Sequence, residues 1–491
     1  MLSSISSEIG FLSLSRQFNM TDRISAPNVY LYAFQLYNDS EGHDNPLWQQ
    51  CDKILSNFAY TYERLTPHLV FPEKSHSYSQ DLLSDTALFF NTPNPLIEGF
   101  AQPRQFQDSY GLCLNIGCLE NGTADNIDVS FIEKFNPNQA LLISGDDKFL
   151  GQTLIVTAWL TNETLPDNLD SLKPLADKCR DSLFSGNSPP TFYRSGKLFG
   201  SPIFEYGSIS DIANYRHLFV WLLCDKQTDV DFNTCQEEIF NLLFHRNKII
   251  KAFQDSRQIY HELDAEYRTI EKNMENLQQQ FTQGTILTAS QLLELQEQLK
   301  QLFSKAVTYT RLLRKLEDFD NTIAINLYNY SDILQKICVM IEGDKEELSI
   351  LNRFSIKSAP YMRSQIAGDL GYFRHGTGLI EQAIASIRGI VEIEQARSDR
   401  TNQLELRNSE LAEKNRDDRL ESTIQAIGVG LATGGIAAGS GTDKLFDTLK
   451  SNPANAPVTS VLHPFIFSFV LSCTIGIFTS AIVWCWTRRK K

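Results

Sequence analysis

The residues of this sequence best suited to chemistry lie near its C-terminal end, where small and hydroxyl side chains recur along an uncharged stretch. In the segment 422–442, Ser422, Ala426, Val429, Thr433, Ala437 and Ser440 follow one another at steps of three or four and would share one helix face. Hydroxyl groups on such a face can contact a hydrated ion without binding it tightly. Asp418 extends the face, and a ring of its carboxylates would concentrate cations. We therefore predict pore-lining positions at Asp418, Ser422, Thr433 and Ser440.

The same stretch also allows a purely structural interpretation. Small side chains let helix backbones approach closely, with or without a pore. Gly430 and Gly434, and likewise Gly435 and Gly439, have the spacing of a close helix contact. These four glycines are therefore predicted helix-packing positions, and the small face can serve packing alone.

The acidic residues at both ends of the stretch can be interpreted in two ways, as groups that attract cations or as ordinary solvated side chains. Asp443 and Asp447 follow it and would attract cations at an outer mouth, although Lys444 and Lys450 lie beside them. Asp418 lies between flanking arginines, so it can also be an ordinary solvated residue.

The charge pattern predicts that this stretch crosses a membrane together with a second one. Segment 464–487 is apolar, contains no Asp, Glu, Lys or Arg, and exceeds the roughly 20 residues of a membrane span. Its basic tail, 488–491, favours the cytoplasmic side. Segment 422–442 is also uncharged, and a Gly-rich linker is its alternative. Two spans joined by an outer loop, 443–463, place both termini in the cytoplasm of a multi-pass protein of the cell (inner or plasma) membrane.

Composition excludes several classes of function. The 491 residues carry a net charge of −14, which argues against a nucleic-acid partner. The nine cysteines are scattered, as is typical of reduced thiols. No P-loop and no His or Cys pattern of a metal site occurs, so we predict no catalytic residues and expect a protein that is not an enzyme.

The elements that must position the C-terminal stretch are predicted from periodicity. Residues 1–235 have the short apolar runs of a mixed α/β domain, with strands expected at 29–36, 140–144, 153–160 and 217–224. Residues 236–356 have helical periodicity with a break at 283–285, which predicts a helical hairpin or coiled-coil region.

A long stalk helix is predicted over 357–421. Ile380, Ile384, Ile387 and Val391 form its apolar seam, and four glycines, Gly371, Gly376, Gly378 and Gly389, are points where it could kink. The predicted fold class is thus an α+β cytoplasmic domain, a long helical coiled-coil stalk and two transmembrane helices. Continued to the membrane, the stalk would measure on the order of 120 Å at 1.5 Å per residue.

This layout resembles the CorA-type superfamily of divalent-cation channels and transporters. The resemblance rests on the stalk at about 360–421, the spans 422–442 and 464–487, and the tail 488–491. It implies a pentameric funnel whose stalk helices and first spans line the pore, with a divalent cation such as magnesium as cargo. The signature of that family, Gly-Met-Asn at the outer end of the first span, is replaced here by the run 439–443, Gly-Ser-Gly-Thr-Asp.

Three functional hypotheses follow. The first is an oligomeric channel or transporter for cations, with the lipid bilayer and copies of itself as partners. The second is a membrane-anchored sensor or effector on the same scaffold, whose N-terminal domain binds a ligand or partner without metal transport. The third is a structural tether that has neither flux nor ligand.

Overall fold

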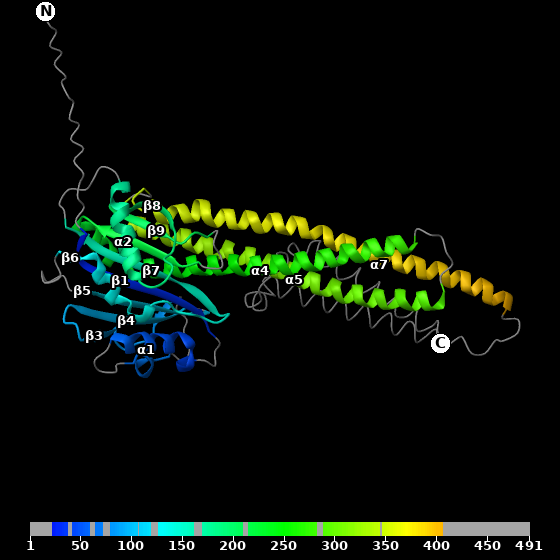
Figure 1. Cartoon of the computed structure of the whole chain (residues 1–491), viewed down its shortest axis with the longest axis horizontal. Coiled ribbons are helices and arrows are strands. Elements are labelled where there is room, and N and C mark those ends of the chain that lie inside the picture. Colours follow the sequence, from blue (N-terminus) through cyan, green and yellow to red (C-terminus); the bar gives the residue numbers. More distant parts are fainter. Residues whose placement is uncertain are drawn as a thin grey trace, which may run out of the picture. The chain divides into compact units, whose positions relative to one another are not determined.

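The computed structural model describes residues 22–37, 42–58, 64–71, 79–106, 108–118, 126–161, 169–209, 215–281, 288–343 and 346–405 (Figure 1). The chain divides into two compact units. The first unit combines Met1–Thr269 with Val307–Thr377, and the second combines Ile270–Ala306 with Gly378–Lys491.

A mixed β-sheet is the centre of the first unit. Its main path runs β2-β4-β5-β1-β7-β10-β9-β8, while β3 pairs with β4 and β6 with β1. The strands are β1 (Arg23–Leu36), β2 (Ser79–Asp81), β3 (Leu88–Asn91), β4 (Ile97–Phe106), β5 (Ser109–Cys118), β6 (Ile127–Asp128), β7 (Phe149–Leu160), β8 (Phe192–Leu198), β9 (Ser201–Tyr206) and β10 (His217–Leu223). Among these pairings β7 and β10 are parallel and the others antiparallel.

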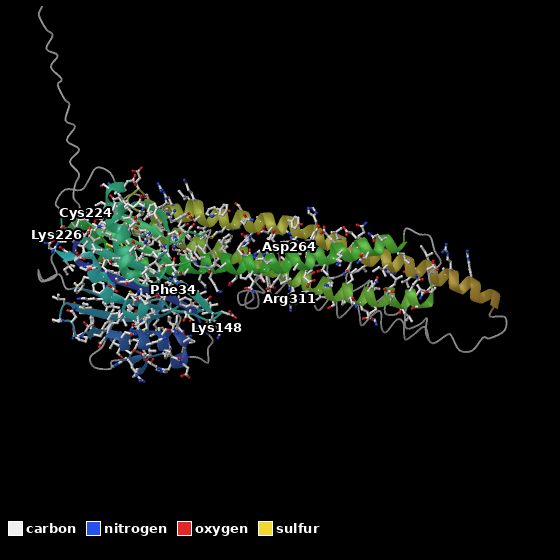
Figure 2. The ribbon with its side chains drawn as sticks, in the orientation of Figure 1. Phe34, Lys148, Cys224, Lys226, Asp264 and Arg311 are labelled. Carbon is white, nitrogen blue, oxygen red and sulfur yellow. The ribbon has the colours of Figure 1, made fainter. Side chains whose placement is uncertain are left out.

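Helices cover both faces of the sheet, as the alternation of side chains along β1 shows. Val29, Leu31 and Ala33 join a core that includes buried residues of α1 (Pro46–Phe58) and α2 (Lys173–Leu183). The alternate residues of β1 meet α3 (Lys226–Thr234) and α4 (Gln236–Phe281). The ring centroids of Tyr30 and Phe232 are 5.3 Å apart, and those of Phe34 and Phe244 are 5.5 Å apart. Phe34 is labelled in Figure 2. Because both faces are apolar, the sheet is buried between two helical layers.

Short turns complete the fold around the sheet. Five are 3₁₀ helices: Gly42–Asp44, Thr66–His68, Val129–Phe135, Pro137–Gln139 and Leu169–Leu172. A single π-helical turn, Phe354–Ser358, joins α6 (Ser349–Arg353) to α7 (Ala359–Glu405).

The long helices agree with the periodicity of the sequence. Helix α4 is followed by α5 (Ala289–Met340), which confirms two long helices where the hairpin was predicted; the predicted break at 283–285 lies outside the described residues. Of the predicted stalk, the long helix is confirmed over α7, which begins at Ala359, beside Pro360. The four residues of its predicted seam are all buried.

The glycines of α7 do not interrupt it. Gly371, Gly376, Gly378 and Gly389 all lie within one continuous α-helix, so the expectation that they are points where the helix could kink is not met in this structure. A Cβ atom built on Gly376 would lie 2.3 Å from the Tyr309 hydroxyl, whereas one on Gly371, Gly378 or Gly389 would meet nothing within 4 Å. Gly376 is therefore a close-packing position.

Three of the four strand predictions are confirmed, at 29–36, 153–160 and 217–224. The prediction of a strand at 140–144 is wrong, because this segment is a turn that follows the 3₁₀ helix Pro137–Gln139. Side-chain amides replace a partner strand there: the Leu141 N–H donates to Asn136 Oδ1 at 2.9 Å, and the Ile143 N–H donates to Gln152 Oε1 at 2.8 Å.

The predicted membrane segments cannot be compared with the described structure. The spans 422–442 and 464–487, the loop 443–463, the tail 488–491 and the last part of the stalk lie outside the described residues. Within the described ranges, no helix has both the length and the apolar character needed to cross a bilayer.

Candidate functional site

The residues predicted from sequence to carry function also lie outside the described ranges. They are the pore-lining candidates Asp418, Ser422, Thr433 and Ser440, the outer-mouth candidates Asp443 and Asp447, and the packing glycines Gly430, Gly434, Gly435 and Gly439. Among the residues that are described, no three His, Cys, Asp or Glu side chains gather as metal ligands, and each cysteine is a free thiol.

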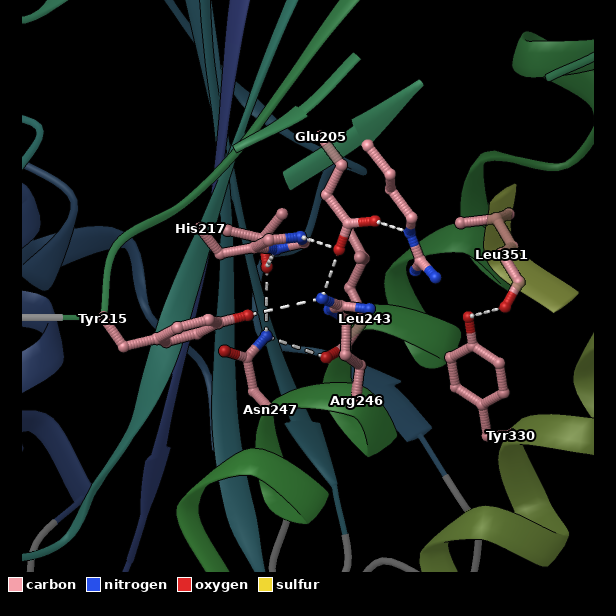
Figure 3. Close-up of polar contacts among 10 residues, drawn as sticks. Glu205, Tyr215, His217, Leu243, Arg246, Asn247, Tyr330 and Leu351 are labelled. Atoms are coloured by element: carbon pink, nitrogen blue, oxygen red, sulfur yellow. Dashed lines mark hydrogen bonds and ion pairs between the residues drawn. The ribbon is translucent and has the colours of Figure 1, made fainter. Parts of the chain in front are cut away.

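A buried carboxylate is the centre of the polar site that the structure does define. Glu205 on β9 is fully buried and is contacted by two guanidinium groups and one imidazole (Figure 3). Arg246 Nη2 donates to Glu205 Oε1 at 2.7 Å, and Arg194 Nε donates to Oε2 at 2.5 Å. His217 Nε2 lies 3.2 Å from Oε1. We call these four residues the Glu205 cluster.

Sheet register brings the members of the cluster together. Glu205 is the register partner of Arg194 across the β8–β9 pair, and His217 begins β10, the strand on the other side of β9. Arg246 reaches the carboxylate from α4, one of the helices that cover this face of the sheet. Glu205 therefore joins three strands to a covering helix.

A second row of polar contacts extends from the cluster. His217 Nδ1 lies 2.9 Å from the Thr153 hydroxyl on β7, and Asn247 Nδ2 donates to the same oxygen at 3.3 Å. Arg246 Nη2 also donates to the Tyr215 hydroxyl at 3.3 Å (Figure 3). The first of these contacts joins β10 to β7, and the other two tie side chains of α4 to the sheet or to the residues that lead into β10.

The electrostatics of the cluster fix its protonation. Burial by itself would raise the pKa of Glu205, but the charge of Arg246, the hydrogen bond from His217 and the charge of Arg194 outweigh it and hold the pKa well below its ordinary value. Burial, reinforced by the Arg246 charge, lowers the pKa of His217 to about 4. At neutral pH the cluster therefore consists of one carboxylate, two guanidinium groups and a neutral imidazole, with a net positive charge.

The extra positive charge is accommodated by an aromatic ring. The Arg246 guanidinium lies over the Phe354 ring of the π-helical turn, 4.2 Å from its centroid. Arg246 Nε and Nη1 have no hydrogen-bond partner among the residues that the structure describes, and the position of the guanidinium over this ring suits a cation–π contact. With exposures of 0 % for Glu205, 2 % for His217 and 1 % for Arg246, these three side chains are buried, and the cluster acts as an internal clamp between the sheet and α4.

Three cavities lie around this unit, each within the size range of small-molecule sites. A cavity of about 350 Å³ reaches the cluster itself, because Tyr215, His217 and Asn247 line it. A second, of about 510 Å³, has a mixed lining that includes Asp108, Lys248 and His245. The third, of about 580 Å³, lies where α4, the end of the π-helical turn and the first turns of α7 meet.

The sequence contained a signal for this cluster that periodicity arguments passed over. Glu205 interrupts the otherwise uncharged run of β9, and Arg246 follows the apolar run of α4 at residues 239–244. A charged residue within a buried run needs a partner of opposite charge. The pairing itself depends on strand register, which the sequence does not contain.

Comparisons of this chain with protein-family models, with curated proteins and with solved structures find no match. Function is therefore argued from the chain's own residues.

Proposed function

We propose that this chain is an oligomeric membrane protein of CorA-like architecture that conducts cations, with copies of itself surrounding a central pore. The observation that carries the proposal is the continuity of α7. This helix begins within the sheet-containing unit and runs unbroken to Glu405, and the uncharged segment 422–442 follows it in the sequence.

The start of α7 is firmly attached, as a helix that transmits force must be. Arg363 makes two hydrogen bonds to Asp320 of α5, from Nε to Oδ1 and from Nη2 to Oδ2, both 2.9 Å long. Arg257 of α4 donates to Asp369 at 2.5 Å. Because α7 is held from two sides at its first turns, a movement of α4 or α5 would displace the start of α7.

The proposal places the pore at the small face of segment 422–442, with Asp418 at the cytoplasmic mouth. Its test is cation flux from liposomes that contain the purified full-length protein. We expect divalent or monovalent cation flux that falls in Asp418→Ala and Thr433→Ala and is retained in Asp417→Ala, because helical spacing would place Asp417 off that face. Liposomes that stay sealed under every cation gradient would exclude conduction.

The number of subunits is the matching structural test. Light scattering with detergent correction should give a discrete pentamer, as the resemblance implies. A monomer or dimer would remove the central pore.

A second candidate is a membrane-anchored sensor or effector on the same scaffold. Two observations favour it: the family's Gly-Met-Asn is replaced by residues 439–443, and a cavity lies beside the first turns of α7. In that case ligand binding, and not flux, would be the primary activity.

A further inference from the structure

The cavity at the start of α7 has features of a binding site for one class of ligand. It is lined by residues from five parts of the first unit: Tyr193 of β8, the loop that follows β9, Phe253 and Arg257 of α4, Lys357 of the π-helical turn, and Tyr361 and Met362 of α7. We call it the root pocket. Its volume of about 580 Å³ is in the middle of the range for small-molecule sites.

The lining of the root pocket is cationic. Among the described residues, Arg257 and Lys357 line it and no Asp or Glu does. Asp369 neutralises part of the Arg257 charge through their 2.5 Å contact and is itself buried, with 6 % exposure. Lys357 is exposed and forms no ion pair with any described residue. The pocket therefore presents a positive charge that is free to meet an anion.

Aromatic rings form another part of the lining. Tyr361 is 62 % exposed and Tyr193 is 37 % exposed, although large aromatic side chains usually bury most of their surface. Phe253 and Met362 also line the pocket, are buried, and provide an apolar floor. Rings with open surface beside an apolar floor suit a planar ligand group, because stacking covers the exposed faces.

The backbone around Lys357 is unusual. Phe354–Ser358 is a π-helical turn, closed by the Ala359 N–H donating to the Phe354 carbonyl, and such turns occur frequently at functional sites. One side of this turn holds the Arg246 guanidinium through Phe354, and another supplies Lys357 to the root pocket. The turn thus joins the Glu205 cluster, the pocket and the first residue of α7.

We propose that the root pocket binds a small anion that carries a planar ring, of the kind that a nucleoside monophosphate represents. The ring stacks against Tyr361 and Tyr193, and the anionic group meets Lys357 and Arg257. This site does not depend on cation conduction. If flux is absent and binding is present, the proposed channel fails while the ligand site stands.

The test is isothermal titration of the full-length protein in nanodiscs with AMP, GMP, CMP and UMP, and with adenosine and ribose 5-phosphate as half-ligands. We expect at least one nucleotide to bind about tenfold or more tightly than ribose 5-phosphate, and AMP, if it binds, to exceed adenosine similarly, since each half makes only part of the contacts. Absence of binding by all four nucleotides at millimolar concentration would overturn the proposal. Ribose 5-phosphate binding as tightly as the best nucleotide would also overturn it, because the ring would then contribute nothing.

Variants locate the binding. Lys357→Gln and Tyr361→Leu alter exposed side chains, and each should weaken nucleotide binding by about five- to tenfold. Lys315→Gln and Tyr328→Leu are the matched controls, because both side chains are exposed on α5 and line none of the three cavities described above. Equal affinity in the pocket variants and the controls would place the nucleotide elsewhere and refute the assignment.

Discussion

Arg246 of α4 and Glu205 of β9 form a fully buried ion pair, with Nη2 and Oε1 2.7 Å apart, and this contact fixes the helix to the sheet. Two guanidinium groups share the one carboxylate, since Arg194 binds its other oxygen. Removing the carboxylate charge would leave both cations buried without a counter-ion, which is far more costly than losing a surface pair.

The first prediction concerns that charge. Glu205→Gln keeps the shape of the side chain and removes the counter-ion, so it should destabilise the first unit by about 3–5 kcal/mol. Chemical denaturation followed by near-ultraviolet circular dichroism would measure the loss. Glu262→Gln is the control. It makes the same chemical change at an exposed position of α4, the helix that carries Arg246, and should change stability by less than about 0.5 kcal/mol. Equal effects of the two substitutions would show that the cluster does not hold the unit together.

The second prediction is that folding stability begins to decrease at a pH above the range where carboxylates titrate. The pKa of His217 is lowered from 6.5 to about 4, and that of His245 is also lowered to about 4, in both cases mainly by burial. As the pH falls below about 6.5 the unfolded chain binds these two protons and the folded chain does not. Stability should therefore decrease between about pH 6.5 and 4, by roughly 1.4 kcal/mol per pH unit for each histidine.

Thermal unfolding of the full-length protein across this pH range would measure the effect. Glu205 contributes in a separate window, because its pKa is lowered from 4.5 and its stabilisation is lost only as the pH falls below that value. In His217→Gln the amide can still donate to Glu205 but does not titrate, so the slope above pH 4.5 should decrease by about one proton. An unchanged slope would mean that His217 is already protonated in the folded protein.

The elements that the sequence predicted well are those set by local pattern. The long helices and the strands at 29–36, 153–160 and 217–224 follow from periodicity, since burial of one face or both is expressed within each segment. The strand predicted at 140–144 failed because the side-chain amides of Asn136 and of Gln152 on β7 satisfy its backbone groups in place of a partner strand. The Glu205 cluster and the root pocket could not be predicted either, because each depends on segments that meet only after the sheet order and the helix packing are fixed.

The third prediction separates two glycines of the same helix. Gly376→Ala would place a methyl group 2.3 Å from the Tyr309 hydroxyl, which already donates to the Phe373 carbonyl at 2.6 Å. We expect a loss of about 1–3 kcal/mol from this overpacking. Gly371→Ala meets nothing within 4 Å and should stabilise the helix by about 0.5–1 kcal/mol.

Hydrogen exchange of α7 peptides would report both changes, with faster exchange in Gly376→Ala and slower exchange in Gly371→Ala. If both substitutions stabilised the helix, Gly376 would be a simple helix weak point and not a packing position.

The last prediction concerns the π-helical turn Phe354–Ser358, which holds one more residue than an α-helical turn. Deleting the exposed Ile356 should convert the turn to regular α-helix while the helix faces on both sides keep their contacts, so the fold should survive with a loss of about 1–2 kcal/mol.

Deleting the exposed Ser364 from regular α7 is the control. That deletion rotates the preceding and following parts of the helix by about 100° relative to each other, which separates Arg363 from its two-bond contact with Asp320 or displaces the buried residues beyond it. The Ser364 deletion should therefore unfold the first unit, as circular dichroism would record.

Because Lys357 moves when the turn closes, the Ile356 deletion should also lose nucleotide binding at the root pocket. If the Ile356 deletion folds and still binds the nucleotide with undiminished affinity, the π-helical turn does not shape the pocket. If both deletions disrupt the fold equally, the turn does not arise from one extra residue in an otherwise regular helix.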